Sequence, residues 1–292
     1  MRGYKRLLIA AFLLLAMIAV VSCGQQTDDS VTVPDGTGMQ SIIVSGDGID
    51  GGMAFTLTDL RTLPDAEFEH IYSTVNNWPA AKFYAARGIR VDAILEAAGL
   101  MDTASIITFR SHDSYEIALT RKQIFEDAQY YFPGMAEENA EGAEKVYPIL
   151  AYEFKEGSDD MAKAAPEEFC LIIGQRNHLE HTNPAFVENI KEIIVSASPS
   201  EKWRQASVFP ASGRIPAGES IKLQHPEFGL VKLFYTLDGS DPTEFSTMYN
   251  PSTYQPELNK PIVFNESATL KVLVTGYGRE DSDIAVFEIE VQ

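Results

Sequence analysis

Residues 231–243 read VKLFYTLDGSDPT and predict a β-strand followed at once by a tight turn. The run from Val231 to Thr236 is a short, partly alternating strand pattern. Gly239 tolerates a positive φ, so the triplet at residues 237–239 is typical of a hairpin turn. Asp238 and Asp241 could bind calcium, or their side chains could cap the turn. Capping is the commoner use of aspartates in such a turn.

The last third of the chain continues this pattern of short strands and turns. From residue 206 to residue 292 no helical periodicity is found, and further strand-like runs occur at residues 220–223, 268–274 and 284–291. Clusters of turn-forming residues separate these runs. The pattern predicts a small all-β, immunoglobulin-like sandwich over residues 206–292, joined to the rest of the chain by a linker at residues 198–205.

Residues 40–197 differ, because strand-like runs alternate there with helices. The clearest helix runs from Arg90 to Ala98, with apolar residues at i, i+3, i+4 and i+7 and with Gly99 placed to end it. Thr120 is placed to begin a second helix. The ten acidic residues between Met135 and Glu168 predict a solvated loop. The expected strands are at residues 40–44, 104–109, 115–119, 147–154, 169–173 and 186–195.

The composition excludes several classes of protein. The 292 residues are 45% hydrophobic and 22% charged, as in an ordinary globular protein. The formal net charge of −19 disfavours electrostatic binding to nucleic acid or to an anionic membrane surface. Cys23 and Cys170 are the only cysteines, so a disulfide scaffold and a four-cysteine metal site are excluded. Cys170 lies in an apolar run and is expected in the core rather than as a nucleophile.

The N-terminus resembles a bacterial lipoprotein export signal. Basic residues at positions 2, 5 and 6 precede an apolar run of 15 residues, and Ser22-Cys23 follow. This run is shorter than the ~20 residues that a membrane-spanning helix needs. The pattern predicts a signal peptide over residues 1–22, a lipid on Cys23 and a flexible tether over residues 23–39. The expected location is the extracytoplasmic face of the cell membrane, held through the lipid.

Five stretches of residues 40–197 follow an order known from one enzyme family. They read FTLTDL at 55–60, ARGIRVDAILEAAG at 86–99, FRSHDSY at 109–115 and PILAY at 148–152, followed by the strand-like run at 186–195. In this order they resemble the molybdopterin-binding domain of the sulfite oxidase superfamily. The resemblance implies an α+β sulfite-oxidase-like domain over residues 40–197 and a molybdopterin-dependent oxidoreductase.

The chain departs from that family where the metal would be held. The family's molybdenum-ligating cysteine lies upstream of residues 86–99, but residues 70–84 contain no cysteine, and Ser73 is the nearest oxygen-bearing substitute. A neutral hydroxyl is a poor replacement for a soft thiolate. Ser114 also stands where the family has a glycine. We therefore expect neither a metal nor a cofactor, with molybdopterin as the alternative.

The resemblance implies cofactor contacts but no catalytic residue. Arginines in or near the matching stretches are candidates to bind the phosphate of the pterin cofactor. The cofactor-binding candidates are Arg87, Arg90, Tyr115, Arg176 and His178.

The densest group of polar residues is GQRNHLEHTNP at residues 174–184. His178 and His181, with Glu180 between them, could form a two-histidine, one-carboxylate metal site. The other reading is a hydrogen-bonded loop whose polar side chains stabilise its own turns, and it is favoured because no distant third ligand can be identified.

Smaller groups of residues also have two readings. His112, Asp113 and Tyr115 could act in acid–base chemistry or form one turn at a strand end, and the turn is favoured. Trp78 and Tyr84 could line a pocket or belong to the core, and the core is favoured. No serine-hydrolase elbow, Walker motif or dinucleotide-binding motif is found.

The stretch at 235–243 has matching neighbours on both sides. PASG at 210–213 and AGESI at 217–221 precede it, and ATLKV at 268–272 follows it. Together they are similar to the chitobiase/hexosaminidase C-terminal-like domain, a small immunoglobulin-like accessory module of bacterial surface proteins. This resemblance implies a sandwich and brings no catalytic residues.

Three functions remain open, and the sequence does not decide whether the chain is an enzyme. The first is a lipid-anchored surface protein whose oxidoreductase-like domain has lost metal ligation and binds a ligand or a partner. The second is an active molybdopterin-dependent oxidoreductase at the cell surface. The third is glycan binding through the sandwich. The expected partners are thus the membrane, through the lipid, and a protein or glycan at the cell surface, but not nucleic acid.

Overall fold

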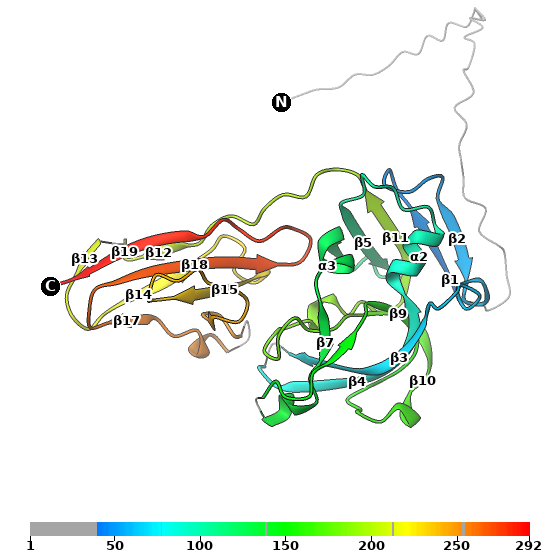
Figure 1. Cartoon of the computed structure of the whole chain (residues 1–292), viewed down its shortest axis with the longest axis horizontal. Helices are drawn as coiled ribbons and strands as arrows, with labels where there is room; N and C mark the ends of the chain where they lie inside the picture. Colours follow the sequence, from blue (N-terminus) through cyan, green and yellow to red (C-terminus); the bar gives the residue numbers. More distant parts are fainter. Residues whose placement is uncertain (1–39, 77, 138, 212, 253–254) are drawn as a thin grey trace, which may run out of the picture. The chain divides into compact units, whose positions relative to one another are not determined.

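The computed structural model describes residues 40–292 except residues 77, 138, 212 and 253–254 (Figure 1). These residues lie within one compact unit, residues 32–292. The predicted signal peptide, the predicted lipid attachment at Cys23 and the predicted tether lie outside the described residues. Within the described part, no helix is both long and apolar enough to cross a membrane.

The predicted α+β fold class is wrong, because the protein is mostly β-sheet. Strands hold 46% of the described residues and helices only 12%. The two expected helices do form, as α2 (Val91–Ala97) and α3 (Arg121–Phe125), and a further helix, α1 (Leu57–Leu60), was not expected. Each of the three is only one or two turns long. Gly99, with a φ of +83°, follows α2 at once, so the helical periodicity cannot extend. A capping box at Thr120 opens α3, as expected from the sequence.

Two large sheets and a two-stranded one, β7-β8, build the described part of residues 40–197. The first has the strand order β2-β1-β11-β5-β6, in which β1 and β11 are parallel and the other pairs are antiparallel. The second is fully antiparallel, with the order β10-β9-β4-β3. The bounds are β1 (Ser41–Ser45), β2 (Met53–Thr56), β3 (Glu67–Val75), β4 (Ala81–Arg90), β5 (Ile106–Ser111), β6 (Glu116–Thr120), β9 (Ile149–Glu156), β10 (Ala165–Ile172) and β11 (Ile190–Ser196).

The acidic stretch between Met135 and Glu168 is not one solvated loop. It contains β8 (Glu144–Val146), which pairs with β7 (Gln129–Tyr131), and all of β9, as well as the short 3-10 helix η2 (Met161–Lys163). Glu144 and Glu156 lie at exposed ends of β8 and β9, whereas the first four residues of β9 are buried in the sheet.

The core of residues 40–197 lies between the first sheet, α2 and one face of the second sheet. Its largest fully buried side chains include Phe109, Phe169 and Leu150. Cys170 is 1% exposed, which confirms the prediction that it is a core residue. Burial raises the pKa of its thiol well above the ordinary value, so Cys170 is a poor nucleophile.

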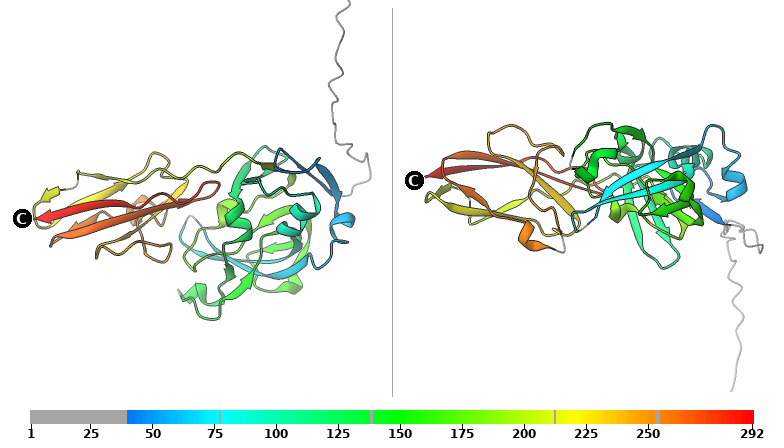
Figure 2. Two further views of the ribbon diagram at one scale, coloured as in Figure 1. Left: turned by 45° about the horizontal axis from the view of Figure 1, so that its top comes forward. Right: turned by 90° about the horizontal axis from the view of Figure 1, so that it is seen from below.

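Residues 207–291 form two facing sheets. One has the order β12-β14-β17 and the other β13-β19-β18-β15-β16, and Figure 2 shows the two sheets lying one over the other. Their inner faces share a separate apolar core that includes Leu233, Val272 and Ile289. The strands are β12 (Ser207–Phe209), β13 (Gly213–Ile215), β14 (Glu219–Gln224), β15 (Val231–Thr236), β16 (Thr247–Met248), β17 (Ile262–Phe264), β18 (Ala268–Gly276) and β19 (Ala285–Val291).

Of the two aspartates after β15, Asp238 caps the turn and Asp241 is paired with a lysine. Asp238 Oδ1 accepts a hydrogen bond from the backbone N of Ser240 at 3.0 Å, and Gly239 has a φ of +77°. Lys271 Nζ donates to Asp241 Oδ1 at 2.7 Å. Among the described residues, no cluster of three His, Cys, Asp or Glu side chains could hold a metal ion. The favoured interpretation as a turn cap therefore holds for Asp238, whereas Asp241 forms an ion pair with Lys271.

Hydrogen bonds join the two parts of the described chain. Gln123, on α3, donates through Nε2 to the carbonyl of Gly276 at 2.7 Å and accepts from the backbone N of Gly278 at 3.2 Å. Asn177 Nδ2 donates to the carbonyl of Glu244 at 2.8 Å. The sandwich is therefore bonded to residues 174–184 and to α3, and the junction between them is a defined surface.

Gly88 allows β4 and β9 to approach closely. A Cβ at this position would lie 2.5 Å from the carbonyl oxygen of Leu150 and 2.6 Å from Cα of Ala151, both backbone atoms. We predict that Gly88→Ala lowers the free energy of unfolding by about 1–3 kcal/mol, because the strands must separate. Gly229→Ala, where a Cβ meets no atom within 4 Å, should change it by less than about 0.5 kcal/mol. Chemical denaturation of both variants measures the difference, and equal stabilities would contradict the prediction.

Candidate functional site

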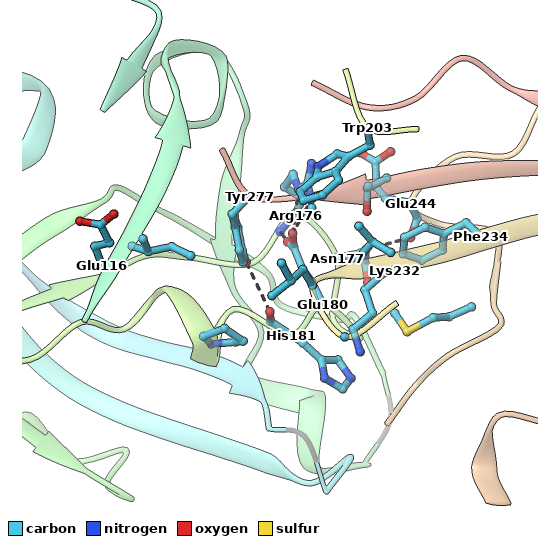
Figure 3. Close-up of a pocket in the computed structure, with 18 of the residues that line it drawn as sticks. Glu116, Arg176, Asn177, Glu180, His181, Trp203, Lys232, Phe234, Glu244 and Tyr277 are labelled. Carbon is cyan, nitrogen blue, oxygen red and sulfur yellow. Dashed lines mark hydrogen bonds and ion pairs between the residues drawn. The ribbon is translucent and has the colours of Figure 1, made fainter. Parts of the chain in front are cut away.

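A cavity of about 490 Å³ lies where residues 174–184 and β6 meet the sandwich (Figure 3). Its walls are mainly apolar, and a few polar side chains converge on it, as in many small-molecule sites. The apolar lining comes from Ile117, Pro184, Trp203, Leu230, Val231, Phe234, Met248 and the ring of Tyr277. The polar lining comes from Tyr115, Glu116, Arg176, Asn177, Glu180, His181, Lys232, Glu244 and Thr275.

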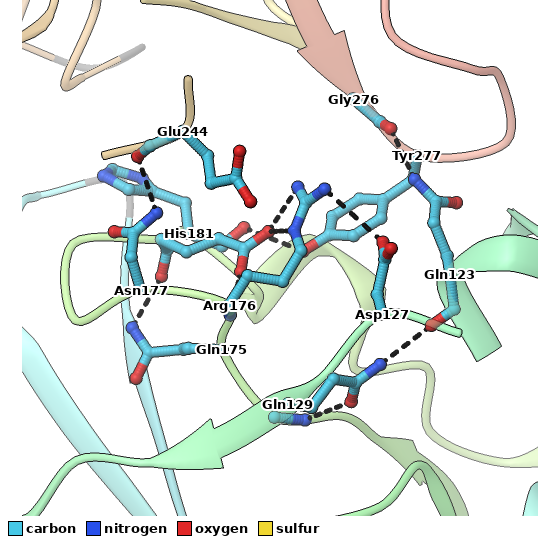
Figure 4. A network of polar contacts seen from close by, with 12 residues as sticks. Gln123, Asp127, Gln129, Gln175, Arg176, Asn177, His181, Glu244, Gly276 and Tyr277 are labelled. Atoms are coloured by element: carbon cyan, nitrogen blue, oxygen red, sulfur yellow. Dashed lines mark hydrogen bonds and ion pairs between the residues drawn. The ribbon is translucent and has the colours of Figure 1, made fainter. Parts of the chain in front are cut away.

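A buried ion pair forms the floor of the cavity (Figure 4). Arg176 Nε donates to Glu180 Oε1 at 2.8 Å, and its NH2 group lies 2.6 Å from the same oxygen. The NH1 group of Arg176 lies 3.6 Å from Asp127 Oδ2. Burial opposes the charged form of Arg176, but Glu180 and Asp127 outweigh it and raise the pKa of the guanidinium. Arg176 is thus fixed as a cation whose charge is already compensated.

The loop that carries this pair is anchored to the sheets behind it. Gln175 exchanges two backbone hydrogen bonds with Tyr130, at 2.8 and 3.0 Å. Its side-chain oxygen accepts from Ser73 Oγ at 2.6 Å, and its side-chain nitrogen donates to the carbonyl of Glu180 at 2.8 Å. Both Ser73 and Gln175 are fully buried. This network gives residues 175–181 a rigid backbone, which is what a binding site requires of its wall.

His181 projects from this loop with an unsatisfied ring nitrogen. The residue is 6% exposed, and its Nδ1 has no hydrogen-bond partner among the described residues. Burial, with a smaller contribution from the nearby Lys232, lowers the pKa of the imidazole to about 3. His181 is therefore neutral at pH 7, with a ring nitrogen free to bond to a ligand.

Lys232 reaches the cavity from β15. Its Nζ donates to the carbonyl of Asn250 at 3.0 Å, and burial lowers its pKa to about 8. The Asn250 side chain holds β15 beside it, because Oδ1 accepts from the N of Leu233 and Nδ2 donates to the carbonyl of Val231, each at 2.8 Å. The described part of the chain places no carboxylate within ion-pair distance of Lys232.

Two of the five predicted cofactor-binding residues line this cavity, and three do not. Tyr115 and Arg176 do so, and the hydroxyl of Tyr115 donates to the carbonyl of Pro184 at 2.9 Å. Arg87 lies on β4, where it is paired with Glu69 and Glu153. Arg90 is paired with Asp92 beside α2. His178 packs edge-on against the ring of Phe132.

These positions do not fit a molybdopterin cofactor. Ser73 stands nearest to the missing cysteine, but its hydroxyl is fully buried, donates to Gln175 and accepts from the backbone N of Phe132 at 2.9 Å. Arg87, Arg90 and Arg176 are each paired with carboxylates and are not brought together to bind a phosphate. The described residues thus provide neither a free metal ligand at Ser73 nor a cluster of uncompensated phosphate donors.

The other predicted groups fall into structural roles. Asp113 Oδ1 accepts from the backbone N of Tyr115 at 2.9 Å and from the Ser111 hydroxyl, which forms a turn after β5. Glu180 is committed to Arg176, so it is not free to join His178 and His181 in a metal site. Tyr84 is buried against Phe186, whereas Trp78 is 61% exposed, so the core prediction holds for Tyr84 and is wrong for Trp78.

The sequence analysis missed the wall of the cavity that the sandwich supplies. Lys232, Trp203, Phe234 and Glu244 were not among its candidates. Lys232 occupies an alternating position of a predicted strand and there resembles an ordinary exposed lysine. No local signal marks these residues, because they meet residues 176–181 only through the tertiary fold.

Comparison with known proteins supports the immunoglobulin-like sandwich. The family model described as Fn3 associated matches residues 221–289, well under half of the chain, and supports an immunoglobulin-like domain there. The narrower chitobiase-type resemblance has no such support. No curated protein matches the chain.

Two solved structures are distant neighbours. The sulfane dehydrogenase SoxCD from Paracoccus pantotrophus is 10% identical, with a TM-score of 0.34 over 87% of this chain and 78% of that chain. The Spr0440 glycoside hydrolase domain, Endo-D, from Streptococcus pneumoniae R6 is also 10% identical, with a TM-score of 0.24 over 77% of this chain and 37% of that chain. Both scores are too low to indicate a shared fold.

The buried ion pair should be necessary for the stability of this region. We predict that Arg176→Met lowers the free energy of unfolding by about 3–5 kcal/mol, because it leaves Glu180 as an uncompensated buried charge. The matched control is Arg214→Met, which removes an exposed pair with Glu290 and should cost less than about 1 kcal/mol. Chemical denaturation distinguishes the two, and a loss at Arg176 as small as that at Arg214 would refute a structural role for the pair.

Proposed function

We propose that this protein is a lipid-anchored, extracytoplasmic binding protein that holds a small organic molecule in the cavity between residues 174–184 and the sandwich. The observation that carries the proposal is the cavity itself. Its volume of about 490 Å³ lies in the range of small-molecule sites, and its wall combines an apolar surface with a few fixed polar groups. The anchor in this proposal is the lipid on Cys23.

The chemistry of the lining favours binding over catalysis. The buried charged pair, Arg176 and Glu180, is internally compensated and rigid. His181 is neutral at pH 7, and in the described part of the chain it interacts with Tyr277, through its backbone carbonyl, and with Lys232 rather than with a nucleophile that it could activate. Such groups can orient a ligand, but they do not form a nucleophile–base pair.

The proposal gives the sandwich a direct role in binding. Trp203, Phe234 and Lys232 line the cavity from the sandwich side, so this part of the chain is more than a spacer. The glycan-binding alternative would place the ligand on the sandwich alone. Binding in the cavity requires that the cavity be open, whereas glycan binding on the sandwich alone does not.

A neutral fluorescent dye tests the cavity. Gly229 lines it, and a Cβ at Gly229 meets no atom within 4 Å, so Gly229→Trp should fill the opening without disturbing the fold. We expect N-phenyl-1-naphthylamine to bind the wild-type protein saturably, with a rise in its fluorescence, and to bind Gly229→Trp at least about tenfold more weakly. Val263→Trp is the control, since Val263 is already exposed on β17 and lies outside the cavity lining. Equal affinities of wild type and Gly229→Trp would refute the proposed site.

A metal and pterin analysis tests the oxidoreductase alternative. We expect protein made in a host that synthesises molybdopterin to carry no stoichiometric molybdenum or pterin, because Ser73 and the three arginines are already bonded within the chain. Elemental analysis and pterin fluorescence measure both components on the same sample. About one molybdenum per chain would overturn the binding-protein proposal and restore the enzyme.

A further inference from the structure

One end of the cavity holds a cation without a counter-charge. Lys232 Nζ bonds to a neutral carbonyl of Asn250, and Lys232 lies close enough to His181 to help lower the pKa of its imidazole. The other buried cation of the cavity, Arg176, is fully paired with carboxylates. A buried ammonium that lacks a carboxylate partner is costly, because the loss of hydration is not repaid. This end therefore favours a negative charge that comes from outside the chain.

We propose that the cavity binds an organic monocarboxylate with an apolar body, and that Lys232 pairs with its carboxylate. This inference rests on the proposed function and specifies its ligand class. The neutral ring of His181, beside Lys232, adds no charge that would compete with the carboxylate. Figure 3 shows the Lys232 and His181 side chains extending from opposite walls toward the same part of the site.

The rest of the lining sets the shape of the ligand. Trp203, Phe234, Met248 and Leu230 form an apolar surface beside the charged end. An aliphatic or aromatic body buried there strengthens binding, because its apolar surface is removed from water. Inorganic phosphate would leave this surface uncovered and would present more charge than one lysine can compensate. An apolar surface beside one lysine therefore favours the binding of an amphiphilic acid, with one carboxylate and an apolar body.

The carboxylates around the cavity do not replace such a ligand. Glu180 forms an ion pair with Arg176. Glu244 lies near Asp281, whose pKa it helps to raise, and Asp281 in turn lies near Arg176. Glu116 lines the cavity from β6 and bonds to Arg110. None of these carboxylates contributes to the shift of the Lys232 pKa, which burial alone lowers. The Tyr115 and Tyr277 phenols, whose pKa values burial raises, stay neutral.

Binding should depend on pH in one direction. A bound carboxylate favours the charged lysine, so it raises the pKa of Lys232 above its free value of about 8 and the ligand binds together with a proton. Between about pH 6 and about pH 7 Lys232 is already charged and the carboxylic acid is ionised, so the affinity is nearly constant. Above pH 8 the affinity falls, by about tenfold between pH 7 and pH 9. His181, with a pKa of about 3, does not titrate in this window.

The test compares acids with their neutral amides on the full chain. Trp78→Phe leaves Trp203, in the cavity wall, as the only indole, so its fluorescence reports occupancy. The probes are 4-phenylbutyrate and octanoate, each paired with its primary amide. We expect each acid to bind at least about tenfold more tightly than its amide at pH 7, as a charge-assisted pair requires. Lys232→Met should abolish both this preference and the pH dependence.

Lys271→Met is the matched control, because Lys271 lies on the neighbouring strand β18 and is paired with Asp241 outside the cavity lining. It should keep both the preference for acids and the pH dependence. Amides that bind as tightly as acids, acids that fail to bind where the neutral dye binds, or a preference that survives Lys232→Met would each overturn the carboxylate assignment alone. If neither the acids nor the neutral dye bind, the cavity itself is not a binding site and the proposed function fails with it.

Discussion

The buried pair between Arg176 and Glu180 is the contact on which the candidate site depends. It closes the loop at residues 174–184 on itself, and Asp127 extends it toward α3. Two buried charges are stable only when they compensate each other, so the loop has little freedom to adopt another shape. Through Gln175 the same loop is bonded to Ser73 and to Tyr130. The ion pair between Arg176 and Glu180 thus fixes the loop that forms the cavity wall facing the sandwich.

That constraint also determines the charge balance of the cavity. Arg176, the cation expected to bind a cofactor, is neutralised within the chain, whereas Lys232, on the opposite wall, has no carboxylate partner in the described part of the chain. Both residues are largely shielded from solvent, and their pKa values shift in opposite directions because only one of them has a counter-charge. The strongly acidic chain therefore presents a local preference for an anion, although its overall field opposes anions.

The sandwich matters to this site because its strand β15 does two things at once. Its inward residues, such as Leu233, fill the sandwich core, while Lys232 and Phe234 line the cavity. Alternation along a strand makes this division possible, since neighbouring side chains point to opposite faces. The hydrogen bonds from Gln123 and Asn177 to the sandwich hold the two walls together. Removing either part would therefore open the cavity.

The sequence by itself determined the local elements: the strand and capped turn at residues 231–243, the short helix before Gly99, the capping box at Thr120 and the burial of Cys170. Each depends on neighbours within a few residues, so periodicity and turn chemistry suffice. It did not determine the fold class, because helices of one or two turns carry the same periodic signal as longer ones but little of the structure. Only the tertiary structure decided the site, since Lys232 and His181 lie 51 positions apart in the sequence. Their meeting depends on long-range packing, and so does the lack of a counter-charge that gives Lys232 its chemistry.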